Sequence, residues 1–193
     1  MEREIIFTGI GGQGIQLMAK VLAQAAADEG RCVMLFGVYS GAMRGSPSES
    51  TLVVADTEIQ APPIVPQCWS VVAMHPQSLD TLAPKLRPNG WFFSNATLVP
   101  APARPDITSV PIPATGMAEQ AGNIMGAGMI MLGAFVARTE LVSLVNVISA
   151  MRAALPAHRS RMADMNAALL QRGADFIRDG AGSAARTAQE ATR

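Results

Sequence analysis

A glycine-rich segment near the start of the chain has the residue types and spacing of an anion-binding turn. Residues 9–14 read Gly-Ile-Gly-Gly-Gln-Gly, follow the apolar residues 5–7, and precede an amphipathic stretch that begins at Ile15. A strand, a G-x-G-x-x-G turn and a helix start can bind phosphate, because backbone N–H groups and the helix dipole attract the anion and no Cβ blocks it. The alternative is that the glycines only let the helix pack closely on the strand. The candidate ligand-binding residues of this turn are Gly9, Gly11, Gly12, Gln13 and Gly14.

A second candidate segment follows the next predicted strand, residues 32–36. Arg44 is the only lysine or arginine between Arg31 and Lys85, and an arginine beside small residues is suited to clamp a phosphate. Because the carboxyl ends of parallel strands meet at one edge of a sheet, we expect this segment beside the glycine turn. An interface role, or a salt bridge from Arg44 to Glu49, is the alternative. The candidate ligand-binding residues here are Ser40, Arg44, Gly45 and Ser46.

NAD fits this pair of segments poorly. A dinucleotide site of this type needs an aspartate or glutamate about 20 residues after the glycines, where its carboxylate holds the ribose hydroxyls. No acidic residue occurs from Arg31 through Ser48, and Asp28 and Glu29 come too early, at the end of the predicted helix. The pattern therefore favours phosphate or pyrophosphate binding of another kind, with structural packing of the glycines as the alternative.

Residues for covalent or metal catalysis do not form any recognisable set. The G-x-S-x-G motif of serine hydrolases is absent, and His75 and His158 are far apart in sequence, with a capping or surface role expected for His75. The two cysteines, Cys32 and Cys68, are isolated, so they cannot supply the ligands of an iron–sulfur cluster or a structural zinc site. Cys32 is expected to be a small apolar residue in a buried strand. We predict no catalytic and no metal-binding residue in this chain.

The composition indicates a protein that binds other proteins through part of its surface. Only 16% of the 193 residues are charged, against about 25% in typical proteins, and 49% are hydrophobic. So little charge predicts that part of the surface is buried in an interface. The net charge of zero argues against nucleic-acid binding. Sparse cysteines and no secretory signal predict a cytoplasmic location, and no stretch is suited to span a membrane.

Strand and helix signals alternate along the first half of the chain, and helices dominate the second half. This order predicts an α/β fold, a single Rossmann-like domain with a mostly parallel sheet flanked by helices. The domain is expected to cover residues 1–178, and residues 179–193 to form a tail that is disordered or ordered by a partner. The predicted strands are residues 5–7, 32–36, 50–55, 69–74, 91–94 and 107–110, and the predicted helices are residues 15–29, 78–86, 126–137, 141–155 and 159–178.

Taken together, these motifs resemble the gamma subunit of the 2-oxoacid:ferredoxin (acceptor) oxidoreductase family. The family's G-x-G-G-Q-G turn is similar to residues 9–14, its Y-G-x-x-x-R-G-G-x-x-x-S loop to residues 39–50, and its M-L-G-A helix to residues 131–134. The chain departs from the family pattern at Ser46, where the family has a glycine, and at His75, where it often has asparagine. The resemblance covers roughly residues 4–178.

The resemblance implies a subunit that is inactive alone. Enzymes of this family, of the pyruvate, 2-oxoglutarate and phenylglyoxylate type, oxidatively decarboxylate a 2-oxoacid to its acyl-CoA. It implies that partner subunits of the alpha, beta and delta type carry thiamine diphosphate and iron–sulfur clusters, with ferredoxin or an NAD-reducing subunit as acceptor. This chain would pack on the thiamine-bearing subunits and help to bind coenzyme A through its glycine turn. A non-catalytic scaffold subunit of the same complex and a stand-alone nucleotide-binding oxidoreductase are the alternatives.

Overall fold

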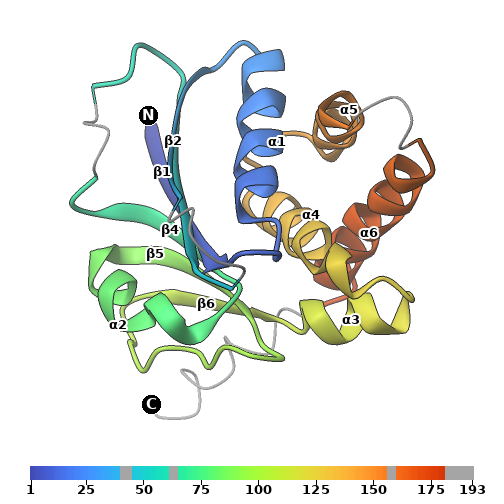
Figure 1. Ribbon diagram of the computed structural model, residues 1–193. Coiled ribbons are helices and arrows are strands. Elements are labelled where there is room, and N and C mark those ends of the chain that lie inside the picture. The colour runs from blue at the N-terminus through green and yellow to red at the C-terminus, as the bar shows by residue number, and fades with distance from the viewer. Residues whose placement is uncertain (40–44, 61–64, 156–159, 181–193) are drawn as a thin grey trace.

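The computed structural model describes residues 1–39, 45–60, 65–155 and 160–180, and Figure 1 shows a sheet with helices against both faces. Helices α1, α4, α5 and α6 lie on one side of the sheet, and the short helix α2 lies on the other. Among the described residues, no helix is both long enough and apolar enough to span a membrane. Residues 181–193, most of the predicted tail, lie outside the described part.

All six predicted strands are present, and they form one sheet in the order β2-β3-β1-β4-β5-β6. Strands β1, β4, β5 and β6 are parallel neighbours, whereas β3 runs antiparallel to both β1 and β2. Five strands therefore point the same way, which confirms the mostly parallel sheet. The strands are β1 (Glu2–Ile10), β2 (Cys32–Tyr39), β3 (Pro47–Ala55), β4 (Cys68–Ala73), β5 (Leu86–Asn95) and β6 (Thr108–Ile112).

The antiparallel position of β3 corrects one expectation about the second strand. Because β3 pairs with β1 along its whole length, β2 is displaced to the edge of the sheet. Cys32 is consequently exposed and not buried as predicted, and Leu35 and Phe36 are each 42% exposed. An apolar run predicts that a strand exists, but its position in the sheet depends on which distant strand pairs with it.

The predicted helices are present, but the one expected at residues 78–86 is α-helical only over Leu79–Leu82, with 3-10 turns on either side. Helix α3, between β6 and the apolar helix α4, was not predicted. Its N-cap residue is Pro113, without a side-chain hydrogen bond, so the usual start signal is absent. The helices are α1 (Ile15–Asp28), α2 (Leu79–Leu82), α3 (Ala114–Gln120), α4 (Ala127–Thr139), α5 (Leu144–Ala154) and α6 (Ser160–Arg178), and the 3-10 turns are η1 (Pro76–Ser78), η2 (Ala83–Lys85) and η3 (Ile124–Gly126).

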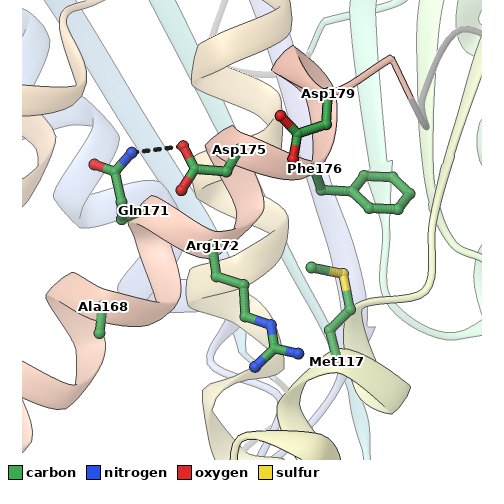
Figure 2. A pocket seen from close by; sticks show the side chains of 7 residues that line it. All are labelled: Met117, Ala168, Gln171, Arg172, Asp175, Phe176 and Asp179. Carbon is green, nitrogen blue, oxygen red and sulfur yellow. Dashed lines mark hydrogen bonds between the residues drawn. The ribbon is translucent and has the colours of Figure 1, made fainter.

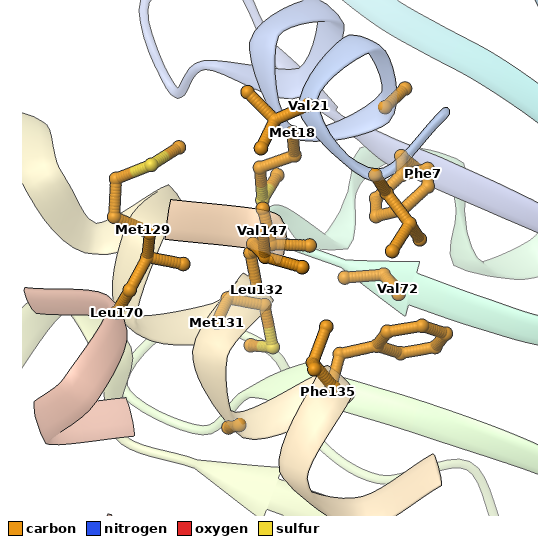
Figure 3. Packing of buried hydrophobic residues seen from close by; sticks show 14 of the residues in the cluster. Phe7, Met18, Val21, Val72, Met129, Met131, Leu132, Phe135, Val147 and Leu170 are labelled. Atoms are coloured by element: carbon orange, nitrogen blue, oxygen red, sulfur yellow. The ribbon is translucent and has the colours of Figure 1, made fainter. Parts of the chain in front are cut away.

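Helix α4 lies at the centre of the main core, between the sheet and α6 (Figure 3). Phe135 contacts Phe7 and Phe93 of the sheet, with ring centroids 6.2 and 4.9 Å apart. On the opposite side, α4 touches α6 backbone to backbone, since a Cβ built on Gly133 would lie 1.9 Å from the carbonyl oxygen of Leu170. Buried on all sides, α4 is apolar around its circumference, which explains its continuous hydrophobic sequence.

Candidate functional site

The glycine turn connects β1 to α1 at the edge where the parallel strands end, called the C-terminal edge below. Gly12 has a φ of +103° and Gly14 a φ of +76°, which L-amino acids with a Cβ rarely adopt. Gly14 is the N-cap of α1 and makes no side-chain cap hydrogen bond. The turn therefore brings backbone and the positive end of the α1 dipole to the surface at this edge.

The structure brings the second candidate segment against the first. The backbone N–H of Gly11 donates to the carbonyl oxygen of Ser46 at 2.9 Å, and a Cβ on Gly11 would lie 3.3 Å from the nitrogen of Gly45. Ile10 and Tyr39, the last residues of β1 and β2, pair with the neighbouring residues 47 and 48 of β3. This register explains the meeting of the two segments. Ser40 and Arg44 lie outside the described residues.

Gln13 acts as an internal clamp of the turn. Its Oε1 accepts a hydrogen bond from the backbone N–H of Ile10 at 3.0 Å, and its Nε2 donates to the carbonyl oxygen of Met74 at 3.1 Å. Its own backbone N–H donates to the carbonyl oxygen of Ile10. These bonds hold the Gln13 side chain against the protein and leave one Nε2–H and one Oε1 lone pair for the predicted ligand contact, which stays a prediction. The turn offers mainly its backbone.

A buried amide that the sequence analysis missed extends this clamp across the sheet. Asn95, the last residue of β5, is fully buried, and its Nδ2 donates to the carbonyl oxygen of Met74 at 3.4 Å and to Thr115 Oγ1 at 2.8 Å. Its Oδ1 accepts from the backbone N–H of Thr115 at 3.2 Å, in the first turn of α3. The available signal was a polar residue at the end of an apolar strand.

Of the two histidines, His75 lies within the described residues, and it acts as a local cap. His75 follows β4, and its Nδ1 accepts a hydrogen bond from the backbone N–H of Gln77 at 3.3 Å, which confirms the predicted capping role. His158 lies outside the described residues. Burial raises the pKa of the Cys68 thiol to about 12, so this cysteine is neutral and unreactive at physiological pH. No group of three or more metal-ligating side chains occurs among the residues that the structure describes.

A separate hollow of about 420 Å³ lies between α3 and α6 (Figure 2). Arg172 reaches from α6 to Gln120 of α3, where its Nη2 donates to Oε1 at 3.1 Å, and the Gln171 amide donates to Asp175 at 2.8 Å. The hollow is open, and its charged groups of both signs include no activated nucleophile. It therefore has the character of a surface groove. Its lining residues are Met117, Ala168, Gln171, Arg172, Asp175, Phe176 and Asp179.

The fold agrees with the comparisons to known proteins. Residues 4–176 match the family model for pyruvate ferredoxin/flavodoxin oxidoreductase, so the chain belongs to this family. Subunit KorC of 2-oxoglutarate synthase from Methanocaldococcus jannaschii is 30% identical over 81% of this chain and 85% of its own length. Ketoisovalerate oxidoreductase subunit VorA from Methanothermobacter thermautotrophicus is 28% identical over 92% of this chain, which spans only 37% of VorA.

Solved structures support the subunit type. The gamma subunit of a keto/oxoacid ferredoxin oxidoreductase from Geobacter sulfurreducens is 25% identical and superimposes with a TM-score of 0.78, over 91% of this chain and 95% of its own. A 2-oxoglutarate:ferredoxin oxidoreductase from Magnetococcus marinus, solved with 2-oxoglutarate, coenzyme A and succinyl-CoA, shares the fold. Its TM-score is 0.82 and its identity 16%, over 92% of this chain and 31% of that one. The predicted resemblance to the gamma subunits of this oxidoreductase family is confirmed.

Proposed function

We propose that this chain is the subunit that receives coenzyme A in an enzyme that converts a 2-oxoacid to its acyl-CoA. The observation that carries the proposal is the contact of Gly11 with Ser46 at the C-terminal edge. It joins two segments that contain glycines at positive φ, Gly12, Gly14 and Gly45, beside the start of α1. Backbone N–H groups at a helix start are suited to a pyrophosphate, which coenzyme A contains.

The absence of an acidic residue from Arg31 through Ser48 favours coenzyme A over NAD as the occupant of this turn. An NAD site of this type uses a carboxylate to hold the two ribose hydroxyls, whereas the ribose of coenzyme A carries a 3′-phosphate that a carboxylate would repel. Arg44, which follows β2 in sequence, supplies a positive charge for such phosphates in this proposal. The coenzyme A bound to the Magnetococcus enzyme supports the same choice.

The proposed reaction divides its chemistry between subunits. The bond between the keto carbon and the carboxylate breaks, CO2 leaves, and the thiol sulfur of coenzyme A forms a thioester with the acyl carbon. The electron pair passes to the acceptor and the thiol proton to solvent. Thiamine diphosphate and iron–sulfur clusters on partner subunits supply the decarboxylation and the electron transfer. The residues of this chain bind and orient coenzyme A.

Exposed apolar side chains next to the turn support packing on the thiamine-bearing subunits. The sulfur of Met165 in α6 accepts a hydrogen bond from the amide of Asn123, so this part of α6 lies beside the start of η3. Helix α4, directly after η3, approaches the turn, because a Cβ on Gly128 would lie 2.9 Å from the carbonyl oxygen of Gln13. A partner seated here would lie beside the bound coenzyme A. We name this surface the methionine face; it comprises Ile124, Met125, Met162 and Met165, which are 54%, 63%, 44% and 45% exposed.

The proposal is tested by coenzyme A kinetics of the assembled complex. Gly12→Ala forces a Cβ into a positive-φ position and should raise the KM for coenzyme A roughly 10-fold, because the backbone of the turn moves. Gly30→Ala is the matched control, since Gly30 has a φ of +77° and open space around it at the other end of α1. Arg44→Ala should also raise this KM.

Two outcomes would decide between this proposal and its alternatives. Unchanged coenzyme A KM values for both Gly12→Ala and Arg44→Ala would leave only a scaffold role for the turn. Purification of the chain alone from its host, without subunits that contain thiamine diphosphate, would support a stand-alone nucleotide-binding protein instead. Binding of NAD(P) or flavin to the isolated chain would then be the direct test.

A further inference from the structure

We propose that Asn95 is a positioning residue for the glycine turn and thereby sets the affinity for the bound phosphate groups. This inference rests on the proposed function, since it assigns the support of the same site. Among the described residues, the hydrogen bonds of Asn95 go to Met74 and Thr115 and not to the turn itself. Its influence passes through the carbonyl group of Met74 and the amide of Gln13.

The hydrogen bonds form one continuous chain along the C-terminal edge. The carbonyl oxygen of Met74 accepts from two side-chain amides, Gln13 Nε2 at 3.1 Å and Asn95 Nδ2 at 3.4 Å. Gln13 Oε1 continues the chain to the backbone N–H of Ile10, directly before the turn. Asn95 continues it in the other direction to Thr115 of α3. These hydrogen bonds thus connect the ends of β1, β4 and β5 to one another and to the start of α3.

Because Asn95 is buried, only an amide side chain can make both of the donor and acceptor interactions at this position. Asn95 is 0% exposed, so water cannot replace a lost partner without a rearrangement of the edge. Both polar atoms of its amide are engaged, Nδ2 as donor and Oδ1 as acceptor. An aspartate has the same shape but no donor, and its second oxygen would face the carbonyl oxygen of Met74. That carbonyl would turn away, and the Gln13 clamp would lose its fixed acceptor.

The glycine turn depends on such external support. Gly12 and Gly14 leave its backbone free of side-chain constraints, and Gly14 makes no side-chain cap at the start of α1. Its shape is therefore held by Gln13, by the bond from Gly11 to Ser46, and by what orients those partners. A misoriented Met74 carbonyl would loosen the turn without removing any group that contacts coenzyme A.

The test compares Asn95→Asp with Asn146→Asp in the assembled enzyme. Asn146 Nδ2 donates to Glu29 Oε1 at 2.9 Å at the opposite edge, so the control also replaces an amide donor that faces an oxygen acceptor. For Asn95→Asp we expect the Kd of coenzyme A, measured by calorimetry, to rise roughly 5- to 10-fold. The KM for coenzyme A should rise equally, while kcat at saturating coenzyme A and the KM for the 2-oxoacid stay within about twofold.

A second pair of variants covers the case in which Asn95→Asp does not fold. Thr115→Val replaces the hydroxyl that accepts from Asn95 Nδ2 by a methyl group and should weaken coenzyme A binding. Thr115→Ser keeps that acceptor and should bind coenzyme A as the wild type does. Normal coenzyme A affinity in folded Asn95→Asp or in Thr115→Val would overturn the inference. If Gly12→Ala weakens binding and these variants do not, only this inference fails. If Gly12→Ala also leaves the Kd unchanged, the proposed function of the turn fails as well.

Discussion

The two edges of the sheet, at the C-terminal and N-terminal ends of the parallel strands, are stabilised by different kinds of interaction. At the C-terminal edge, side-chain amides and backbone groups predominate, as the bonds of Gln13 and Asn95 show. At the N-terminal edge, charged side chains pack on aromatic ones. Arg3 lies over the ring of Trp69 and Arg138 over the ring of Trp91, each with the guanidinium carbon 4.7 Å from the ring centroid.

The N-terminal edge also contains ion pairs and a carboxylate from the end of α1 that bonds to the start of α5. Asp56 binds the N-terminal amino group at 3.2 Å and Arg31 at 3.7 Å. The Glu29 carboxylate accepts hydrogen bonds from Ser143 and Asn146 at the start of α5. An internal carboxylate thus occupies one helix start, whereas the N-cap of α1 at the opposite edge is Gly14, which has no side chain to act as a cap. Among the described residues, no carboxylate is hydrogen-bonded to the start of α1, and this is where we propose that an external anion binds.

The largest effect should come from the aromatic cluster that supports the N-terminal edge. Phe135 contacts Phe7, Phe93 and Trp69, and Phe135→Ala should lower the free energy of unfolding by about 3–5 kcal/mol because it leaves a cavity in the main core. Urea unfolding measures this loss. The folded fraction of the complex should still bind coenzyme A normally, and a large rise in its Kd would contradict the separation of the two edges.

The next effect tests the methionine face beside the C-terminal edge. The double variant Met125→Glu with Met165→Glu should weaken assembly with the thiamine-bearing subunits by roughly 30-fold or more, because charges would replace exposed apolar side chains in the proposed interface. Both side chains are exposed in the free chain, so its melting temperature should change little. Val145→Glu is the control, since Val145 is 75% exposed on α5. Native mass spectrometry of the co-expressed subunits measures assembly, and normal stoichiometry for the double variant would remove this face from the interface.

A smaller effect is expected from one cation–π contact of the N-terminal edge. Arg138→Gln keeps much of the side-chain length but removes the charge over Trp91 and should reduce stability by about 0.5–1 kcal/mol. Arg138→Lys retains a cation and should lose less. Urea titration of the three proteins checks this order. Equal stability of the Gln and Lys variants would mean that packing, and not charge, holds the tryptophan.

The smallest effect concerns the carboxylate that caps α5. Burial raises the pKa of Glu29, but hydrogen bonds from Ser143 and Asn146, together with the charge of Arg31, outweigh it and hold the pKa below its ordinary value of 4.5. A lowered pKa in the folded state adds stability above pH 4.5 that disappears as the pH falls through the folded-state pKa. Glu29→Gln should therefore lower the melting temperature slightly at pH 7 and by less at pH 3. Thermal melts at both pH values measure this, and an equal difference at both would contradict the assigned charge.

Local sequence patterns predicted most elements of this fold and its family. Apolar runs located six strands, glycine spacing located the turn between β1 and α1, and Ile10 and Ile15 mark its two ends. These features involve neighbours along the chain, so periodicity and turn chemistry reveal them. The family motifs added the subunit type, which no physical pattern in the chain contains by itself.

The tertiary structure decided the features that join residues far apart in sequence. Pairing of β3 with β1 moved β2 to the edge and exposed Cys32, although its sequence resembles a buried strand. The bonds from Gln13 to Met74 and from Asn95 to Thr115 span 61 and 20 residues, so no local pattern encodes them. Strand order and long-range hydrogen bonds depend on how all the elements pack together, because each exists only when both distant partners are in place.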